Sequence, residues 1–316
     1  MKIFEIRSDV KLENLARVLI LSFATISLIS AAAAQISQTT GPNGNLVFED
    51  ESNNMLLNLT NSGSVVTSGG LDMSNGVVIG DSAEITHLNA VAIGKNSFAN
   101  KGTIGAGTAV GLDANASRPG NSAFGDEAEA TGEMASAFGG GSEATGNRAT
   151  AIGILSNATD QYATAVGMYS WVKQVTGTAV GYNTQTWDQF GTALGSEAFA
   201  QGYSSTVVGA QSNATGARSV TFGSIANAEN RAVAIGSEAT ASTNYSVAVG
   251  QLSSTVGPGE GGIAIGRSAY AEGSGIAIGQ DAFSDQNRTV VFGGGMYDYD
   301  VEVTGNITAY GRVNEQ

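Results

Sequence analysis

The sequence predicts an all-β protein, a parallel β-roll solenoid built of coils of about 14 residues. First, a glycine preceded by an apolar residue recurs at sixteen regular places from Gly80 to Gly293, mostly 14 residues apart. Second, the residues on either side of that glycine alternate with period two, as strands do. Third, the chain has 44 glycines, only three prolines and 42% hydrophobic residues, which argues against disorder.

Residues 1–34 have the pattern of a secretory signal peptide. Basic residues are followed by the apolar run VLILSFATISLIS and by four alanines, so we expect cleavage before Gln35. The apolar stretch from residue 18 to residue 34 is shorter than the roughly 20 residues that span a bilayer. We therefore expect an exported chain, secreted or at the cell surface, with no membrane-spanning helix after cleavage.

The net charge limits the classes of partner, and the absence of cysteine limits how the chain can be stabilised. Cleavage removes four positive and three negative charges, so the net charge moves from −14 to −15. An acidic surface repels the phosphate backbone, which argues against nucleic acid as a partner. Without cysteine the exported chain has no disulfides, and its stability must come from packing and backbone pairing.

The repeat occupies residues 76–295. Before each anchor glycine stand a β-branched residue, a small residue and a larger apolar one, as in VAI at 91–93 and TAI at 150–152. Small residues recur three and five places after it. We expect two strands of about five residues per coil, with glycine permitting a corner of positive φ. The expected corner glycines are Gly94, Gly125, Gly139, Gly153, Gly167, Gly181, Gly195, Gly209, Gly223, Gly236, Gly250, Gly266 and Gly279.

The flanking segments lack the repeat. Residues 35–75, which include GNLVFEDESNNMLLNL, are expected to cap the first coil, because an open sheet edge invites uncontrolled pairing. Residues 296–316 are expected to form a C-terminal cap or a truncated connector. Two units are longer than 14 residues, and their extra residues fall near 102–107 and in GPGEGG at 257–262, where loops can bulge without breaking the stack.

The thin coil predicts an obligate homo-oligomer. The apolar residues one and three places before each anchor glycine point to one face, and the small residue between them points to the other. A narrow roll cannot enclose both faces. Ordering each residue costs about 1–2 kcal/mol of backbone entropy, whereas burial returns only about 25 cal/mol per Å². One face should therefore be buried against sister chains.

Units such as NAVAIGKNSFANKG (89–102) and RAVAIGSEATAST (231–243) resemble the head repeats of YadA-like trimeric autotransporter adhesins. The resemblance covers about residues 76–295. It implies a left-handed roll, packing as a homotrimer, and a role as an outer-membrane surface adhesin. The basic neck, heptad stalk and membrane barrel of that family do not follow QNRTVVFG (286–293), so the chain is either a fragment or a head held at the surface by other means.

The family's collagen-binding heads use repeats of the form N-S-V-A-I-G-x-x-S. In this sequence the matching residues are Asn89, Val91, Ala92, Ile93, Gly94 and Ser97, with Ala90 in place of the serine. The resemblance makes collagen, or another matrix protein, a candidate partner. The same residues are also what the roll needs in order to fold, so this alternative remains open.

Aromatic residues suggest a second candidate binding site. Trp171 and Trp187 are the only tryptophans, and several tyrosines lie beside them in the sequence. Such a cluster could stack on the sugar rings of glycans or meet a protein partner. The alternative is contact between protomers, because five aromatic residues fall four places after an anchor glycine: Phe98, Trp171, Phe199, Tyr270 and Phe283.

The remaining patterns give weaker hypotheses. A column of threonines three places before the glycine, such as Thr150 and Thr164, resembles an ice-binding ladder. Carboxylates that recur after the glycine, such as Glu127 and Glu143, could hold Ca²⁺, but we favour solvated charge that keeps the stacked rolls soluble, because the Ca²⁺-binding nonapeptide GGxGxD is absent. We expect no catalytic residues, metal or cofactor, since His87 is the only histidine.

The sequence thus predicts a multivalent adhesin head that attaches to host matrix, cells or other surfaces. The alternative of the same fold is a structural fibre with no dedicated receptor. The C-terminal VTGNITA resembles short strands of phage tail-fibre proteins.

Overall fold

The computed structural model describes residues 37–40, 46–49, 55–59, 65–67, 76–86, 89–99 and 105–294. The chain divides after Asp72 into two units. The first contains a four-stranded antiparallel sheet in the order β1-β2-β3-β4. Its strands are β1 (Ser37–Thr40), β2 (Leu46–Glu49), β3 (Met55–Leu59) and β4 (Val65–Thr67). The predicted capping role of residues 35–75 remains a prediction.

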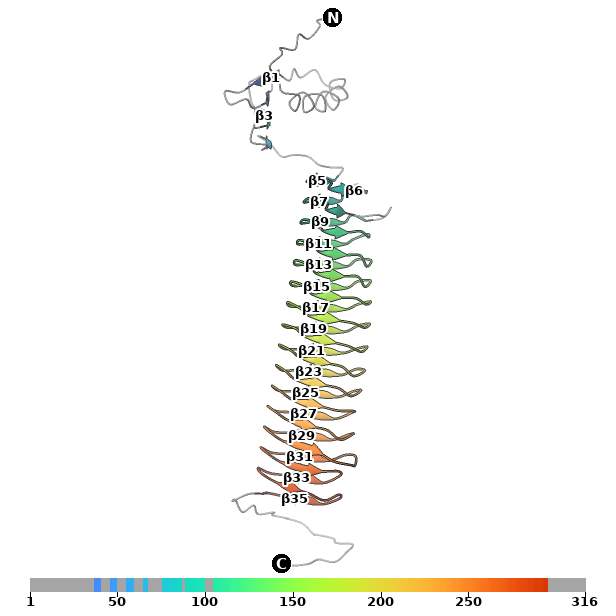
Figure 1. The fold of residues 1–316 in the computed structure, drawn as a ribbon, viewed down its shortest axis with the longest axis vertical. Helices are drawn as coiled ribbons and strands as arrows, with labels where there is room; N and C mark the ends of the chain where they lie inside the picture. Colours follow the sequence, from blue (N-terminus) through green and yellow to red (C-terminus); the bar gives the residue numbers. More distant parts are fainter. Residues whose placement is uncertain are drawn as a thin grey trace, which may run out of the picture. The chain divides into compact units, whose positions relative to one another are not determined.

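The second unit is a stack of two-stranded coils (Figure 1). Odd-numbered strands form one 16-stranded parallel sheet and even-numbered strands form one 15-stranded parallel sheet. The first sheet contains β5 (Val77–Ile79), β7 (Val91–Ile93), β9 (Thr108–Val110), β11 (Ser122–Phe124), β13 (Ser136–Phe138), β15 (Thr150–Ile152), β17 (Thr164–Val166), β19 (Thr178–Val180), β21 (Thr192–Leu194), β23 (Thr206–Val208), β25 (Val220–Phe222), β27 (Val233–Ile235), β29 (Val247–Val249), β31 (Ile263–Ile265), β33 (Ile276–Ile278) and β35 (Val290–Phe292).

The second sheet contains β6 (Glu84–Ile85), β8 (Phe98–Ala99), β10 (Asn115–Ala116), β12 (Glu129–Ala130), β14 (Glu143–Ala144), β16 (Asn157–Ala158), β18 (Trp171–Val172), β20 (Gln185–Thr186), β22 (Phe199–Ala200), β24 (Asn213–Ala214), β26 (Asn227–Ala228), β28 (Thr240–Ala241), β30 (Ser254–Val256), β32 (Tyr270–Glu272) and β34 (Phe283–Ser284). This is the predicted all-β parallel solenoid with coils of about 14 residues. The terminal segment 296–316, predicted as a cap or connector, lies outside the described residues.

The strands are shorter than predicted. Each coil has a strand of three residues and another of two or three, not two strands of five. The remaining residues of each coil form its two corners. Each corner is a full turn whose backbone also makes hydrogen bonds to the neighbouring coil. In the corners Gly94 donates its N–H to Ile79 at 2.7 Å, and Asn96 donates to Asp81 at 2.9 Å. Backbone pairing therefore continues through the turns, and it does not stop at the strand ends.

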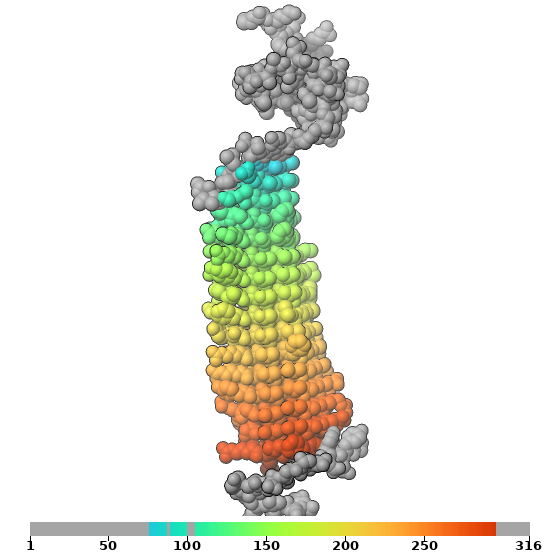
Figure 2. Space-filling model, turned by 180° about the vertical axis from the view of Figure 1, so that it is seen from behind, coloured from blue at the N-terminus to red at the C-terminus, as the bar shows by residue number. Residues whose placement is uncertain are grey.

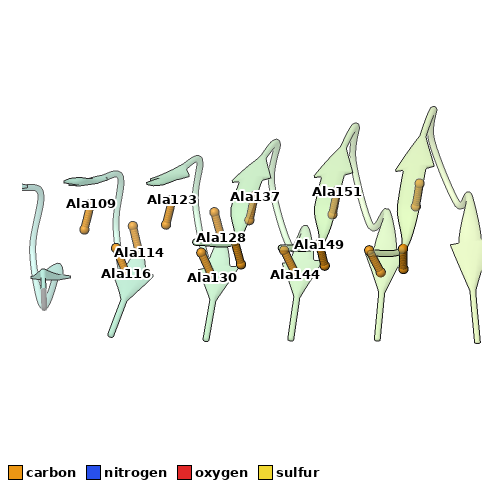
Figure 3. Close-up of a cluster of buried hydrophobic side chains, with 14 of the residues drawn as sticks. Ala109, Ala114, Ala116, Ala123, Ala128, Ala130, Ala137, Ala144, Ala149 and Ala151 are labelled. Carbon is orange, nitrogen blue, oxygen red and sulfur yellow. The ribbon is translucent and has the colours of Figure 1, made fainter. Parts of the chain in front are cut away.

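Small side chains fill the interior. The residue two places before each anchor glycine points inward, as do those three and five places after it, and these positions are mostly alanine. Ala137, Ala151 and Ala165 are fully buried and stack in register. Figure 3 shows Ala123, Ala137 and Ala151 in a row on one side of the interior, with the other labelled alanines, such as Ala130 and Ala144, on the opposite side. The small residue of each triplet therefore faces the interior, a choice that the periodicity left open.

Among the described residues, the largest side chains that this interior buries fully are valine, asparagine and threonine, such as Val172, Val207 and Asn121, so leucine exceeds what it holds. We expect Ala151→Leu to lower the free energy of unfolding by about 3 kcal/mol, because overpacking forces strain on both sheets. Ala210→Leu is the matched control, because Ala210 is exposed in the column where Leu112 and Met168 stand. Urea denaturation followed by circular dichroism measures both. Equal stability of the two variants would contradict the packed interior.

Two features of the structure require glycine at the predicted corner positions. The anchor glycines from Gly94 to Gly279 have φ between 124° and 144°. A Cβ atom at Gly195 would lie 2.5 Å from the carbonyl oxygen of Gly209 in the next coil. Glycine is thus needed for the backbone conformation and also for the close approach of successive coils.

Residues other than glycine also adopt left-handed conformations in the corners. Two places after the anchor glycine, Asn96, Asp113 and Glu127 have φ near 54°. Polar residues such as Asn and Asp tolerate this conformation better than most. Ile225, with a φ of 60°, is the β-branched residue at this position of the described coils, and Thr176 is a β-branched residue with the same φ in the other corner.

We expect Ile225→Asn to raise the free energy of unfolding by about 1 kcal/mol, because the left-handed conformation costs an L-residue about 1–2 kcal/mol. Ile154→Asn is the control. Ile154 is 55% exposed and Ile225 is 52% exposed, but only Ile225 has a positive φ. Urea midpoints should rise for the first variant only. A rise of the same size in both would show that backbone strain is not the cause.

The longer unit at 257–262 bulges without breaking the stack, as predicted. Gly257, Gly259 and Gly261 have positive φ in this loop. The ladder resumes at once, since Val247 donates its N–H to Gly262 at 2.9 Å. β29 then pairs with β31 in register. Of the other predicted bulge, residues 102–104 lie outside the described part of the chain.

Candidate binding surfaces

The two outer faces of the roll differ in chemistry. Figure 2 shows the coils as successive layers of one stack. Outward side chains of the 16-stranded sheet come from positions one and three before the anchor glycine, and we call this surface the apolar face. Outward side chains of the 15-stranded sheet come from the position four places after it, and we call this surface the polar face.

On the apolar face, the column one place before the anchor glycine is apolar without a break. Every residue directly before an anchor glycine is aliphatic or Phe: Ile79, Ile93, Val110, Phe124, Phe138, Ile152, Val166, Val180, Leu194, Val208, Phe222, Ile235, Val249, Ile265, Ile278 and Phe292. Phe222 and Phe292 are each 55% exposed. Phe124 and Phe138 stack with their ring centroids 5.0 Å apart. Monomeric proteins rarely expose so long a contiguous apolar surface, so this face has the chemistry of an interface.

The threonine column lies on this same face. Thr164 pairs with Thr178, and Thr178 pairs with Thr192, so the hydroxyls form a ladder. The column beside the threonines is aliphatic, because Val166 and Val180 point to the same side. Toward the C-terminal coils valine or isoleucine replaces threonine, from Val220 onward. The ladder is therefore one edge of the apolar face and not a paired threonine surface.

The polar face is variable. Its column contains Asn115, Glu129, Glu143, Asn157 and Gln185 among others. The Asn157 amide donates to Glu143 Oε2 at 2.9 Å. The five aromatic residues of the predicted column do stand here, but polar residues separate most of them. Contact between protomers through these aromatic residues, the alternative considered from the sequence, therefore remains a prediction.

Where the polar face meets the corner that precedes it, aromatic, aliphatic and amide side chains surround a hollow of about 260 Å³. Its lining comes from positions two and four of three consecutive coils: Leu155, Asn157, Tyr169, Trp171, Asn183 and Gln185. We call this the six-residue hollow. Leu155, Tyr169 and Trp171 are between 38% and 49% exposed.

The ammonium group of Lys173 contacts the rings of both tryptophans at the edge of this hollow. Lys173 Nζ lies 4.0 Å from the ring centroid of Trp171 and 3.9 Å from that of Trp187. Such contacts are attractive because the ring face is electron-rich. Trp187 Nε1 also donates to Gln185 Oε1 at 2.8 Å. The predicted pair Trp171 and Trp187 is therefore one cluster, and Lys173, which the sequence reasoning missed, lies at its centre.

The residues of the predicted collagen motif do not all reach the surface. Ala92 and Ser97 are fully buried inside the roll. The Ser97 hydroxyl donates to the Gly94 carbonyl at 2.9 Å, so it stabilises the corner. Val91 and Ile93 lie on the apolar face, and Asn89 is exposed with a φ of 69°. Any collagen contact by this motif, which remains a prediction, would come from Asn89, Val91 and Ile93, while Ala92, Gly94 and Ser97 shape the coil.

The described residues hold no group of three or more His, Asp or Glu side chains placed to bind a metal ion. Glu129 and Glu143 are neighbours across β12 and β14, yet Glu143 already accepts a bond from Asn157. His87 lies outside the described residues. In the part of the chain that the structure describes, no helix has the length and apolarity of a membrane span.

The fold and its repeats define a parallel β-solenoid with coils of about 14 residues. The model of the YadA head domain repeat matches residues 130–154, 144–170, 175–198, 200–224 and 228–253. The chain thus contains YadA head domain repeats over much of the roll. A comparison with curated proteins found no match.

Among solved structures, the collagen-binding domain of the Yersinia adhesin YadA is similar to this chain. The two are 23% identical, with 58% of this chain and 78% of that chain covered. The TM-score is 0.29, so no argument here depends on superposing the two molecules.

Proposed function

We propose that this chain is the head of an exported, homotrimeric surface adhesin. Three left-handed rolls would pack around one axis and bury their apolar faces against one another. The polar faces would then point to solvent and carry the binding surfaces. The protein would have no catalytic activity.

The observation that supports this proposal most strongly is the unbroken apolar column of the 16-stranded sheet. Sixteen coils stacked at about 4.8 Å make a stripe on the order of 70 Å long. In a monomer this stripe would remain in water, and each half-exposed side chain would forgo about 25 cal/mol per Å² of apolar area. Sister chains of the same sequence present a stripe of the same length and period.

Attachment would depend on repetition. A shallow surface such as the six-residue hollow has few contacts, and three copies on one rod would multiply weak contacts by avidity. The candidate receptors are matrix proteins such as collagen and glycans of host cells or other surfaces. The place of action would be the outside of the cell, as for YadA-like adhesins.

Binding of the exported chain to immobilised collagen, fibronectin and a glycan array tests this function. We expect at least one class of ligand to bind the oligomer, and binding to weaken by at least tenfold when the oligomer is dissociated. Uniformly negative binding by an intact oligomer would contradict the adhesin function and favour a structural fibre with no dedicated receptor.

A further inference from the structure

The six-residue hollow differs from the surface above and below it in charge. The protein has a net charge of −14, and the same two columns contain Glu127, Glu129 and Glu143 before the hollow and Glu197 after it. The hollow itself contains only aromatic, aliphatic and amide side chains. Charged side chains of both signs contact this lining, Lys173 at Trp171 and Glu143 at Asn157, and their opposite charges offset one another, which favours an uncharged ligand.

The hollow combines ring faces with amide groups. Tyr169 and Trp171 provide aromatic surface that stacks on the apolar face of a sugar ring. Trp187 Nε1 donates to Gln185 Oε1, and Gln185 Nε2 donates to Asn183 Oδ1 at 3.2 Å. The Asn183 amide nitrogen then has no hydrogen-bond partner among the described residues. This chain of bonds leaves Asn183 as a fixed donor for a hydroxyl oxygen.

Lys173 restrains the aromatic platform. Its ammonium lies between the Trp171 and Trp187 rings, and neither Lys173 nor Trp187 lines the hollow. Lys173 and Trp187 stand where the strand leads into the next corner of the coil. Leu155, Tyr169 and Asn183 border the hollow from the preceding corner. A ring held in this way loses little freedom when a ligand stacks on it, which favours binding.

The hollow lies on the face that the proposed trimer leaves in solvent. The apolar face continues unchanged through these coils as Ile152, Val166 and Val180. The aromatic cluster is instead confined to a few coils of the polar face. A local feature on a variable face is suited to a ligand, whereas an axial contact would recur along the roll.

Together, the geometry points to a binding site for a neutral oligosaccharide at the six-residue hollow. The three coils span about 10 Å, which accommodates a short run of sugar rings. Trp171 and Tyr169 stack on the pyranose rings, and the amide of Asn183 donates to a ring hydroxyl. This inference rests on the proposed adhesin function, because it names one ligand class and its site on that head.

The test uses the exported oligomer and an array of neutral oligosaccharides that includes chitotetraose, maltotetraose and oligo-N-acetyllactosamine, with sialylated and sulfated glycans beside them. We expect binding to at least one neutral probe. Trp171→Ala should weaken it by at least tenfold. Phe199→Ala is the matched control, because Phe199 occupies the same column two coils away, outside the hollow. It should bind like the wild type.

Two further measurements keep the result interpretable. Light scattering and circular dichroism show whether Trp171→Ala keeps its mass and fold. If it does not, Asn183→Ala replaces it with the same expectation. Both tryptophans lie in this cluster, so the bound neutral probe should also change the intrinsic fluorescence of the wild-type protein.

Three outcomes would overturn the site. One is equal binding by the wild type and Trp171→Ala, and another is binding restricted to sialylated or sulfated glycans. The third is no neutral glycan bound while the same preparation binds collagen or fibronectin. In that third case the adhesin function stands and only the oligosaccharide site fails.

Discussion

Replacing Gly139 by alanine is expected to lower the free energy of unfolding by about 3 kcal/mol or more. Gly139 has a φ of 134°, and an added Cβ atom would lie 2.5 Å from the carbonyl oxygen of Gly153. No flexible side chain can move aside there, because the obstacle is the backbone of the next coil. The ladder between β13 and β15 would have to separate locally.

The next residue provides the control. Gly140 has no positive φ, and its added Cβ would be 3.7 Å from the nearest heavy atom, the carbonyl oxygen of Asp126. Gly140→Ala should therefore leave stability unchanged or raise it by a few tenths of a kcal/mol through the unfolded state. Urea denaturation of both variants measures the difference. Two equally stable variants would refute the account of the anchor glycine.

Replacing three neighbouring residues of the apolar face by aspartate is expected to dissociate the predicted oligomer. Phe222, Ile235 and Val249 are neighbours in register on β25, β27 and β29. Buried at a shared axis, each unpaired carboxylate would cost about 3–5 kcal/mol. Replacing all three by Asp should weaken association by more than a thousandfold. Light scattering over a dilution series measures the mass of each species.

The control places three aspartates in the same coils on the polar face. Asn227, Thr240 and Ser254 are also neighbours in register, on β26, β28 and β30. Their replacement by Asp creates the same repulsion within one chain, since the spacing between coils is the same. We expect this variant to keep the mass of the wild type. Dissociation of both variants would mean that repulsion within the chain, and not the apolar interface, is the cause.

Much of the fold could be predicted from the sequence, because each coil repeats the same local constraints. The 14-residue period sets the register, and the triplet around Ala151 shows period-two alternation. Which side faced inward could not be read from alternation alone, since alanine and valine are both apolar. The structure settles it, because the fully buried residues between the sheets are mostly alanine and serine, such as Ala137 and Ser142, and none of those described is larger than valine or asparagine.

The strand lengths and the backbone conformations of the corners were harder to predict from the sequence. A turn with two residues in unusual conformations occupies positions that the sequence pattern assigned to strands. At these corners Tyr169 and Leu155 have φ values of 60° and 53°, although neither residue favours that region. Pairing with the next coil fixes the conformation, so local preference is a poor guide there.

The binding surfaces could be predicted only in part. Trp171 and Trp187 were visible as the only tryptophans, but Lys173 looked like any surface lysine. Writing the sequence in rows of 14 would bring Lys173 and Trp187 into one column, because both stand six places after an anchor glycine. The collagen motif shows the reverse case, since Ala92 and Ser97 matched a pattern whose place in this chain is the buried interior.

The central claim is that sister chains cover the apolar face, and the mass of the exported protein in solution tests it most directly. The full chain has a mass of 31.9 kDa, which removal of the predicted signal peptide would lower. Size-exclusion chromatography with light scattering should give three times the mass of the processed chain down to low micromolar concentration. A folded, stable monomer at that concentration would contradict the claim.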